Sequence, residues 1–165
     1  MSSPSDLASA IVAECRRREL TIGVAESLTG GLLVAALVAV PGASAVVNGG
    51  VVAYNTAIKH SVLGVEASLL AAHGPVDPNV AKEMAMGARE RLAVAGRPAS
   101  IGISTTGVAG PEPQGGQPVG TVYIGTATEA GASSIRLSLS GTREDIRNAV
   151  VYESLVQLTE LLATL

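Results

Sequence analysis

The sequence predicts an α/β fold: a three-layer sandwich in which helices cover both faces of a mixed, mostly parallel sheet. Strand-like apolar segments alternate with segments of helical periodicity along the chain. There are three Tyr, no Phe and no Trp, so the core is built from Ala, Val, Leu and Ile, which suits a sheet covered by helices. The length of 165 residues suits one domain, and we expect residues 1–165 to form it.

The first third of the chain predicts helix, strand, helix and strand. Residues 6–19 show apolar i, i+4 spacing and three arginines in the last turn, where cations suit the helix dipole. Residues 20–25 are short and apolar, as in a buried strand. Residues 32–40 predict a helix that ends at Pro41-Gly42. Residues 46–54 form either a hairpin around Asn48-Gly49-Gly50 or one glycine-kinked strand, and we favour the single strand.

The rest of the chain predicts four helices and three strands. Asp77 and Pro78 are a typical N-cap and first helical residue, and Thr142 and Asp145 have capping-box spacing. A tight turn at 129–131 joins two late strands, which must be antiparallel. The expected helices are 56–63, 66–72, 77–95 and one from Thr142 to the end; the expected strands are 100–105, 119–127 and 134–140, with a loop at 107–118.

Composition and charge exclude several classes of protein. A net charge of −3, a pI near 5.3 and few aromatic residues predict no nucleic-acid binding. Residues 27–58 carry no charge, but Pro41, Gly42 and Asn48 to Gly50 interrupt them, so we expect no membrane span. The single Cys15 and an N-terminus without signal-peptide features predict a cytoplasmic protein without an intrachain disulfide.

The segment Glu26-Ser27-Leu28-Thr29-Gly30-Gly31 is the first candidate site. It lies between a strand and a helix, where unpaired backbone N–H groups can bind a phosphate or a developing oxyanion. The Ser27 hydroxyl would face such a site. The alternative is that Ser27 is an N-cap and that the glycines only permit tight packing.

Tyr54 and Lys59 are the second candidate site. Lys59 is one of two lysines and follows the long uncharged region. A lysine beside an apolar pocket can have a lowered pKa and act as a general base, and Tyr54 could relay a proton. The alternative is a surface lysine and a half-buried tyrosine.

Two further segments could bind a ligand. Residues 104–111 follow a strand, and ligands in open α/β folds bind at the carboxyl ends of strands. Arg143 and Arg147 are one turn apart at a helix start, where a pair of cations would make sense if it held an anion. The alternatives are a surface loop and a solvated helix face paired with Glu144 and Asp145.

We expect no metal and no cofactor. His60, His73 and Cys15 do not have metal-ligand spacing. The low charge and an alanine-rich surface are compatible with a homo-oligomer.

Taken together and in order, these motifs resemble the CinA C-terminal domain family, the nicotinamide-nucleotide amidohydrolases. The similarity covers residues 5–164 and suggests the stand-alone form, without the extra N-terminal domain of some members. Three positions depart from the family pattern: Thr56 where Asn is frequent, Thr106 for Ser, and Gln117 for Lys. The motifs that carry the similarity are 25–31, 40–44, Tyr54 with Lys59, 63–65, 107–111, 118–122, and Arg143 with Arg147.

The resemblance implies deamidation of nicotinamide mononucleotide to nicotinic acid mononucleotide and ammonia, without a metal. Ser27 would be the nucleophile, Lys59 the base, and Tyr54 its helper. Backbone N–H groups of residues 29–31 would bind the oxyanion, and Arg143 or the glycine-rich loop would hold the phosphate. The expected substrate-binding residues are Glu26, Thr29, Gly30, Gly31, Thr105, Thr106, Gly107, Gly110 and Arg143.

Two other functions fit the same residues. One is a nucleotide-binding or regulatory domain without turnover. The other is a different amidase, or a phosphate-ester hydrolase, on the same scaffold. The presence of both Ser27 and Lys59 favours an enzyme.

Overall fold

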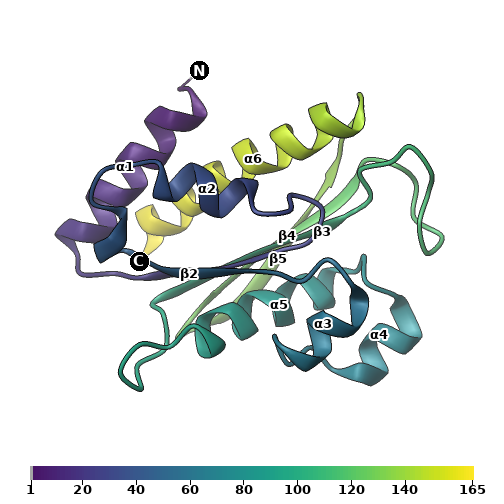
Figure 1. Ribbon diagram of the computed structural model, residues 1–165, viewed down its shortest axis with the longest axis horizontal. Coiled ribbons are helices and arrows are strands. Elements are labelled where there is room, and N and C mark those ends of the chain that lie inside the picture. The colour runs from purple at the N-terminus through teal and green to yellow at the C-terminus, as the bar shows by residue number, and fades with distance from the viewer. Residues whose placement is uncertain (1) are drawn as a thin grey trace.

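The structure, a computed structural model, describes residues 2–165 and has three layers. A five-stranded sheet lies between α1, α2 and α6 on one side and α3, α4 and α5 on the other (Figure 1). The predicted α/β architecture is confirmed. The helices are α1 Pro4–Arg17, α2 Leu32–Val38, α3 Thr56–Ser61, α4 Ala67–His73, α5 Pro78–Arg91 and α6 Arg143–Thr164, with a 3-10 turn at Ala43–Ala45; the strands are β1 Ile22–Glu26, β2 Val47–Val52, β3 Ile101–Gly107, β4 Thr121–Thr128 and β5 Gly131–Ser138.

The sheet has the strand order β2-β1-β3-β4-β5 and is mixed. Strand β1 pairs in parallel with β2 and with β3, whereas β4 runs antiparallel to β3 and β5. Four strands therefore share one direction. Glu26 at the end of β1 is in register with Thr105 of β3, so the carboxyl ends of these strands meet at one edge. The segment 46–54 forms the single strand β2, as we favoured, and no hairpin.

Most predicted boundaries differ from the observed ones by a few residues, and three of the differences are described here. Helix α1 begins at Pro4, before the predicted start, because Ser3 is its N-cap and Asp6 completes a capping box. Helix α5 ends at Arg91, and a tight turn in which Val94 pairs with Arg97 and Ala95 has a left-handed φ of 52° follows it. Strand β5 begins at Gly131, because Gly131 pairs directly with Thr128.

Helix α5 lies unusually close to the sheet because the residues between them are small. A Cβ at Gly102 would overlap the carbonyl oxygen of Ala85, and one at Gly23 would overlap that of Ala88. On the opposite face, α1, α2 and α6 enclose a core of aliphatic side chains that includes Ile11, Leu37, Ile103, Leu155 and Leu158.

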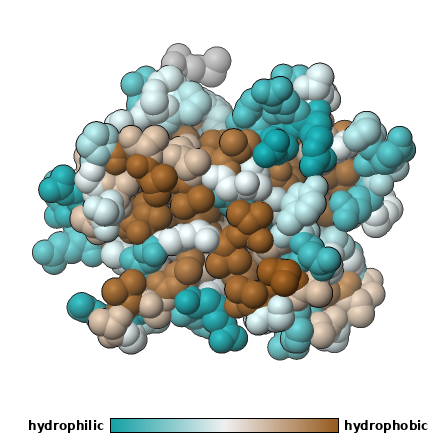
Figure 2. Space-filling view, viewed as in Figure 1, coloured by the Kyte–Doolittle hydropathy of each residue, from teal (hydrophilic) through white to brown (hydrophobic). Residues whose placement is uncertain are grey.

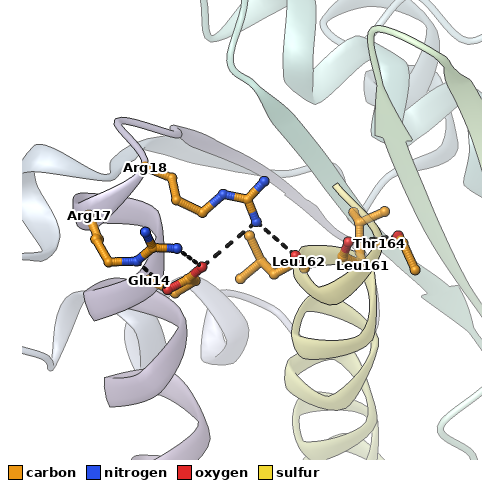
Figure 3. Close-up of polar contacts among 6 residues, drawn as sticks. All are labelled: Glu14, Arg17, Arg18, Leu161, Leu162 and Thr164. Atoms are coloured by element: carbon orange, nitrogen blue, oxygen red, sulfur yellow. Dashed lines mark hydrogen bonds and ion pairs between the residues drawn. The ribbon is translucent and has the colours of Figure 1, made fainter.

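The first and last helices are tied together at their C-terminal ends (Figure 3). Arg18 donates a hydrogen bond of 2.8 Å to the carbonyl oxygen of Leu162, which is otherwise left free at the end of α6. The same guanidinium lies 3.8 Å from the carboxylate of Glu14, which also pairs with Arg17 at 2.6 Å. The hydrogen bond from Arg18 to Leu162 therefore holds the C-terminal ends of α1 and α6 together.

The uncharged residues 27–58 are divided among the turn after β1, helix α2, the 3-10 turn, β2 and the start of α3. No helix within residues 2–165 is long and apolar enough to cross a lipid bilayer.

Candidate active site

A cleft lies at the carboxyl ends of β1 and β3 and has a volume of about 130 Å³. Its walls come from the turn after β1, the start of α3, the segment before α5, the loop after β3 and the first residue of α6. Larger grooves of about 670 and 870 Å³ lie at the opposite ends of these strands, around Pro98 and Ser100. The chemistry of the lining distinguishes the smaller cleft, because it contains a buried hydroxyl and a buried amine.

Ser27 and Lys59 meet in this cleft. The Nζ of Lys59 donates a 2.9 Å hydrogen bond to the Oγ of Ser27 and a 2.6 Å hydrogen bond to the carbonyl oxygen of Ala53. Lys59 is only 1% exposed and Ser27 8% exposed. Thirty-two residues separate the two in the sequence, and the parallel β1–β2 pair followed directly by α3 brings them together.

Burial lowers the pKa of Lys59 from the ordinary 10.5 to about 8, because the charged ammonium loses its hydration. Within residues 2–165 no carboxylate lies within 4.0 Å of its Nζ, where it would stabilise the ammonium and raise the pKa again. A fraction of this lysine is therefore neutral near pH 7 and can accept a proton from the hydroxyl beside it.

Thr29 and Thr105 form hydrogen bonds that fix the backbone around Ser27. The backbone N–H of Ser27 donates to the carbonyl oxygen of Thr105 at 3.0 Å, and the two threonine hydroxyls hydrogen-bond each other at 2.8 Å. Both threonines are fully buried and neither lines the cleft. In this structure they hold the turn that carries Ser27, and their predicted contact with a substrate stays a prediction.

Glu26, which was predicted to contact substrate, does not line the cleft and instead caps α2. Its buried carboxylate accepts hydrogen bonds from the N–H groups of Gly31, Leu33 and Val34, at 3.0, 3.1 and 2.8 Å. These N–H groups belong to the first turn of α2, which leaves its amides unpaired. Glu26 thus replaces the anion that the glycine-rich turn was predicted to bind.

The predicted oxyanion donors at Gly30 and Gly31 are occupied as well. Gly30 donates to the carbonyl oxygen of Ser27 at 3.1 Å, and Gly31 donates to Glu26. Both glycines have left-handed φ values, 59° and 101°, which turn the chain from β1 into α2. Among residues 2–165 the backbone N–H groups of Leu28 and Thr29 find no acceptor, and Leu28 lines the cleft next to Ser27. Of the predicted donors at residues 29–31, only Thr29 therefore keeps a free N–H, and the N–H of Leu28 is a further candidate.

Tyr54 and Arg143 bridge the mouth of the cleft. Arg143 donates from Nη2 to the Tyr54 hydroxyl at 2.9 Å and from Nη1 to the carbonyl oxygen of Gly110 at 2.8 Å. Tyr54 is 61% exposed, and its hydroxyl contacts Arg143 instead of Ser27 or Lys59. The predicted proton relay through Tyr54 is therefore not formed in this structure.

Thr106, Gly107 and Gly110 line the cleft as predicted from the strand end. The Thr106 hydroxyl donates to the carbonyl oxygen of Pro75 at 2.6 Å and so fastens the segment before α5 to β3. A Cβ at Gly107 would be crowded by the backbone of Thr121 in β4, so only glycine fits there.

Arg147 does not pair with Arg143 around an anion, as the sequence suggested. Its Nε donates to the carbonyl oxygen of Leu28 at 2.9 Å and its Nη2 to that of Thr29 at 3.2 Å. The one-turn spacing of the two arginines indicated that both face the same side, but it could not reveal that one holds the Ser27 turn while the other spans the cleft mouth.

Pro75 and Val76 line the cleft but gave no sequence signal, because the segment before α5 contains no chemical motif. Leu28, Val108 and Ala109 lie within the predicted segments 26–31 and 104–111, although they were not named as ligand-binding residues. The remaining lining residues that were not predicted to bind a ligand are Thr56, Glu112 and Gln114. Within residues 2–165 no cluster of three or more His, Cys, Asp or Glu side chains could hold a metal ion.

Comparison with known proteins identifies the family. The model of the CinA C-terminal domain matches residues 4–162. A CinA-like protein of Frankia casuarinae is 47% identical over 149 residues, which cover 90% of this chain and 33% of that protein. A putative competence-damage inducible protein of Geobacillus kaustophilus is 48% identical over 149 residues, 90% of this chain and 35% of that one. The chain thus spans about a third of the length of these curated relatives.

Solved structures share the whole fold. The crystal structure of the competence/damage inducible protein CihA from Agrobacterium tumefaciens is 33% identical, with a TM-score of 0.89 over 98% of this chain and 99% of that one. A CinA superfamily protein from Enterobacter cloacae is 28% identical, with a TM-score of 0.92 over 98% and 94% of the two chains. The chain described here belongs to the CinA C-terminal domain family.

Proposed function

We propose that this chain is an amidohydrolase that converts nicotinamide mononucleotide to nicotinic acid mononucleotide and ammonia, with Ser27 as the nucleophile. The observation that carries the proposal is the 2.9 Å hydrogen bond between Lys59 and Ser27 inside a cleft. A serine is activated when an adjacent base takes its proton, and a desolvated lysine can be that base. Family membership supports the same activity as an expectation.

Acylation begins when the Oγ of Ser27 attacks the carboxamide carbon and neutral Lys59 accepts the hydroxyl proton. The carbonyl oxygen becomes an oxyanion, for which the free N–H groups of Leu28 and Thr29 are the candidate donors. The ammonium of Lys59 then gives its proton to the amide nitrogen. The C–N bond breaks, ammonia leaves, and an ester between Ser27 and the nicotinoyl group remains.

Deacylation repeats these steps with water. Lys59, neutral again, accepts a proton from the water that attacks the ester carbon. It then returns that proton to the Oγ of Ser27 as the C–O bond breaks. The products are the free serine and the carboxylic acid, which releases its proton to solvent. The hydrogen bond from Lys59 to the Ala53 carbonyl keeps the amine in place throughout.

The small volume of the cleft supports a division of the substrate between the cleft and its mouth. At about 130 Å³ it is smaller than the roughly 300–1,000 Å³ of pockets that enclose whole ligands. It would take the pyridine carboxamide, while the ribose phosphate extends to the mouth. Arg143 is an exposed cation at that mouth and would hold the phosphate, with Tyr54 beside it.

The test measures ammonia release from nicotinamide mononucleotide by the unmodified chain, by Ser27→Ala and by Ser154→Ala. Ser154 is a matched control, because it is a fully buried serine whose hydroxyl bonds the Val150 carbonyl within α6, outside the cleft. We expect turnover by the unmodified chain and the control, and its loss in Ser27→Ala. Equal rates in all three would refute Ser27 as nucleophile.

Calorimetry on the same proteins separates turnover from binding. Binding of the mononucleotide without ammonia release would support a regulatory domain and overturn the amidase. A panel of other amides and phosphate esters identifies the substrate class if the mononucleotide is not hydrolysed. Trapping an acyl group on the peptide that contains Ser27, by mass spectrometry, would demonstrate the covalent intermediate directly.

A further inference from the structure

Three side chains that line the cleft can carry a charge near pH 7: Lys59, Glu112 and Arg143. Lys59 is the buried amine beside Ser27, and Arg143 spans the mouth. Glu112 supplies the only carboxylate among the described residues of the lining, and the proposed reaction does not use it. A single negative charge beside two cationic groups bears directly on which ligands the cleft prefers.

The carboxylate of Glu112 has no partner within residues 2–165. No Lys, Arg or His nitrogen of this part of the chain lies within 4.0 Å of it. Arg143 lines the same cleft, but its two Nη atoms bond the Tyr54 hydroxyl and the Gly110 carbonyl oxygen instead. The negative charge of Glu112 is therefore available to a bound ligand.

The loop after β3 holds Glu112 between two fixed points. The carbonyl oxygen of Gly110 accepts the 2.8 Å hydrogen bond from Arg143. Gln114 and Gln117 exchange backbone hydrogen bonds of 3.1 and 2.9 Å, which close a short hairpin. This loop, drawn in green, projects at the right of Figure 1, and Figure 2 shows hydrophilic residues on the projection. A group anchored in this way loses little conformational freedom when a ligand binds.

The ring of the proposed substrate is a cation. In a nicotinamide mononucleotide the ring nitrogen is bonded to ribose, so the pyridine is a pyridinium with a positive charge. The ammonium form of Lys59 and the guanidinium of Arg143 repel such a ring, whereas the carboxylate of Glu112 attracts it. Tyr54 is the only aromatic residue of the described lining, and the face of a tyrosine ring also attracts cations. A neutral amide gains neither attraction.

We propose that Glu112 makes the cleft select carboxamides on a positively charged pyridinium ring over neutral carboxamides. The inference rests on the proposed function and adds to it a substrate class and a specificity-determining residue. Glu112 attracts the ring inside the cleft, while Arg143 attracts the phosphate at the mouth. The two opposite charges of the substrate thus meet two opposite charges of the protein.

A role for Glu112 in proton transfer fits the structure less well. The hydroxyl of Ser27 already has the Nζ of Lys59 at 2.9 Å, and Glu112 makes no hydrogen bond to either group. Transfer of a proton requires hydrogen-bond distance. Electrostatic attraction has no such requirement, because it falls off only gradually with separation.

The expected preference is moderate, because Glu112 is exposed and water screens its charge. Exposed ion pairs contribute up to about 1 kcal/mol, which corresponds to about fivefold in affinity. We therefore expect a pyridinium carboxamide to bind about fivefold more tightly than an uncharged carboxamide of the same shape.

A matched pair of ligands isolates the ring charge. Nicotinamide methylated on its ring nitrogen and meta-methylbenzamide have nearly the same shape and the same carboxamide, but only the first is a cation. Binding of each is measured by NMR titration of Ser27→Ala, in which turnover cannot interfere. We expect the cation to bind about fivefold more tightly, and this preference to disappear when Glu112→Gln is added.

Glu144→Gln is the matched control for Glu112→Gln. Glu144 is an exposed carboxylate in the first turn of α6, directly after Arg143, and it does not line the cleft. We expect this variant to keep the preference. Circular dichroism checks that each variant keeps the fold, as expected for a change of one exposed side chain.

Three results would overturn the proposal. The first is equal binding of the two ligands by Ser27→Ala. The second is a preference that survives Glu112→Gln. The third is an equal loss of preference in Glu144→Gln, because that result would assign the effect to the net charge of −3 and not to Glu112.

Ionic strength gives an independent measurement. The preference should shrink as salt is added, because the screening length falls from about 10 Å at 0.1 M to about 3 Å at 1 M. A difference that arises from ligand shape would not respond to salt. A preference that stays constant over this range would therefore contradict an electrostatic role.

Kinetics with the mononucleotide separate this inference from the proposed reaction. The ring has the same charge in the bound substrate and in the transition state of acylation, so Glu112 should stabilise both equally. Glu112→Gln should therefore raise KM about fivefold and leave kcat within about twofold. A fall in kcat at constant KM would overturn the proposal. If the unmodified chain releases no ammonia, the proposed function fails, while the ligand pair still decides the role of Glu112.

Discussion

The pH dependence of turnover tests the proposed role of Lys59. If neutral Lys59 takes the proton of Ser27, the rate below its pKa follows the neutral fraction of this one amine. Burial places that pKa at about 8. The neutral fraction is then about 1% at pH 6, about 10% at pH 7 and half at pH 8.

These fractions give the expected profile. The value of kcat/KM, which reports the free enzyme, should rise about tenfold from pH 6 to 7 and about fivefold from pH 7 to 8, and then level off above pH 9. A lysine at its ordinary pKa of 10.5 would instead give a rise that continues through pH 9. The position of the plateau therefore measures how far burial shifts this group.

The assay records initial rates of ammonia release from pH 6 to 9.5 at constant ionic strength. Ser154→Ala serves as the control and should reproduce the profile of the unmodified chain. In Lys59→Ala the rate should collapse, and added primary alkylamines should restore part of it with a midpoint that follows the pKa of the amine. A flat profile between pH 6 and 9, or a rate that falls with pH, would refute Lys59 as the base.

Three further predictions concern stability and positioning. Burial of a charged lysine with a pKa 2.5 below its ordinary value opposes folding by about 3 kcal/mol below pH 8, and the penalty fades as the pH rises toward 10.5. At pH 7 Lys59→Met should therefore unfold at a higher urea concentration than the unmodified chain. Its free energy of unfolding should be greater by up to about 2 kcal/mol, after the cost of leaving the Ala53 carbonyl unpaired, and this difference should disappear near pH 10. Arg147→Gln should lower kcat about 10- to 100-fold with little change in KM, because the Ser27 turn loses its two anchors, and Arg147→Lys should recover part of the loss in steady-state assays. Gly102→Ala should destabilise the fold by at least about 2 kcal/mol in urea unfolding, because its Cβ would overlap the backbone of Ala85; an unchanged midpoint would mean that α5 can move away freely.

Local rules were sufficient for much of the fold. Capping pairs such as Thr142 with Asp145 fixed helix starts, because the hydrogen bonds involved join residues three positions apart. The same rules failed by a few residues at the start of α1, where the capping residue Ser3 lies outside the apolar pattern, and at the end of α5, where a turn with a left-handed Ala95 follows that the residue types do not reveal.

The sequence by itself determined the layered architecture and placed Ser27, Thr106 and Gly107 at strand ends, because periodicity and turn residues act over short distances along the chain. Only the tertiary structure decided which polar groups meet. Glu26 could have faced a ligand, yet it caps α2; Arg147 could have held an anion, yet it holds carbonyl groups. Hydrogen bonds form over about 3 Å and need particular directions, and such distances between residues far apart in the chain arise only from packing. The contact between Ser27 and Lys59 is of this kind.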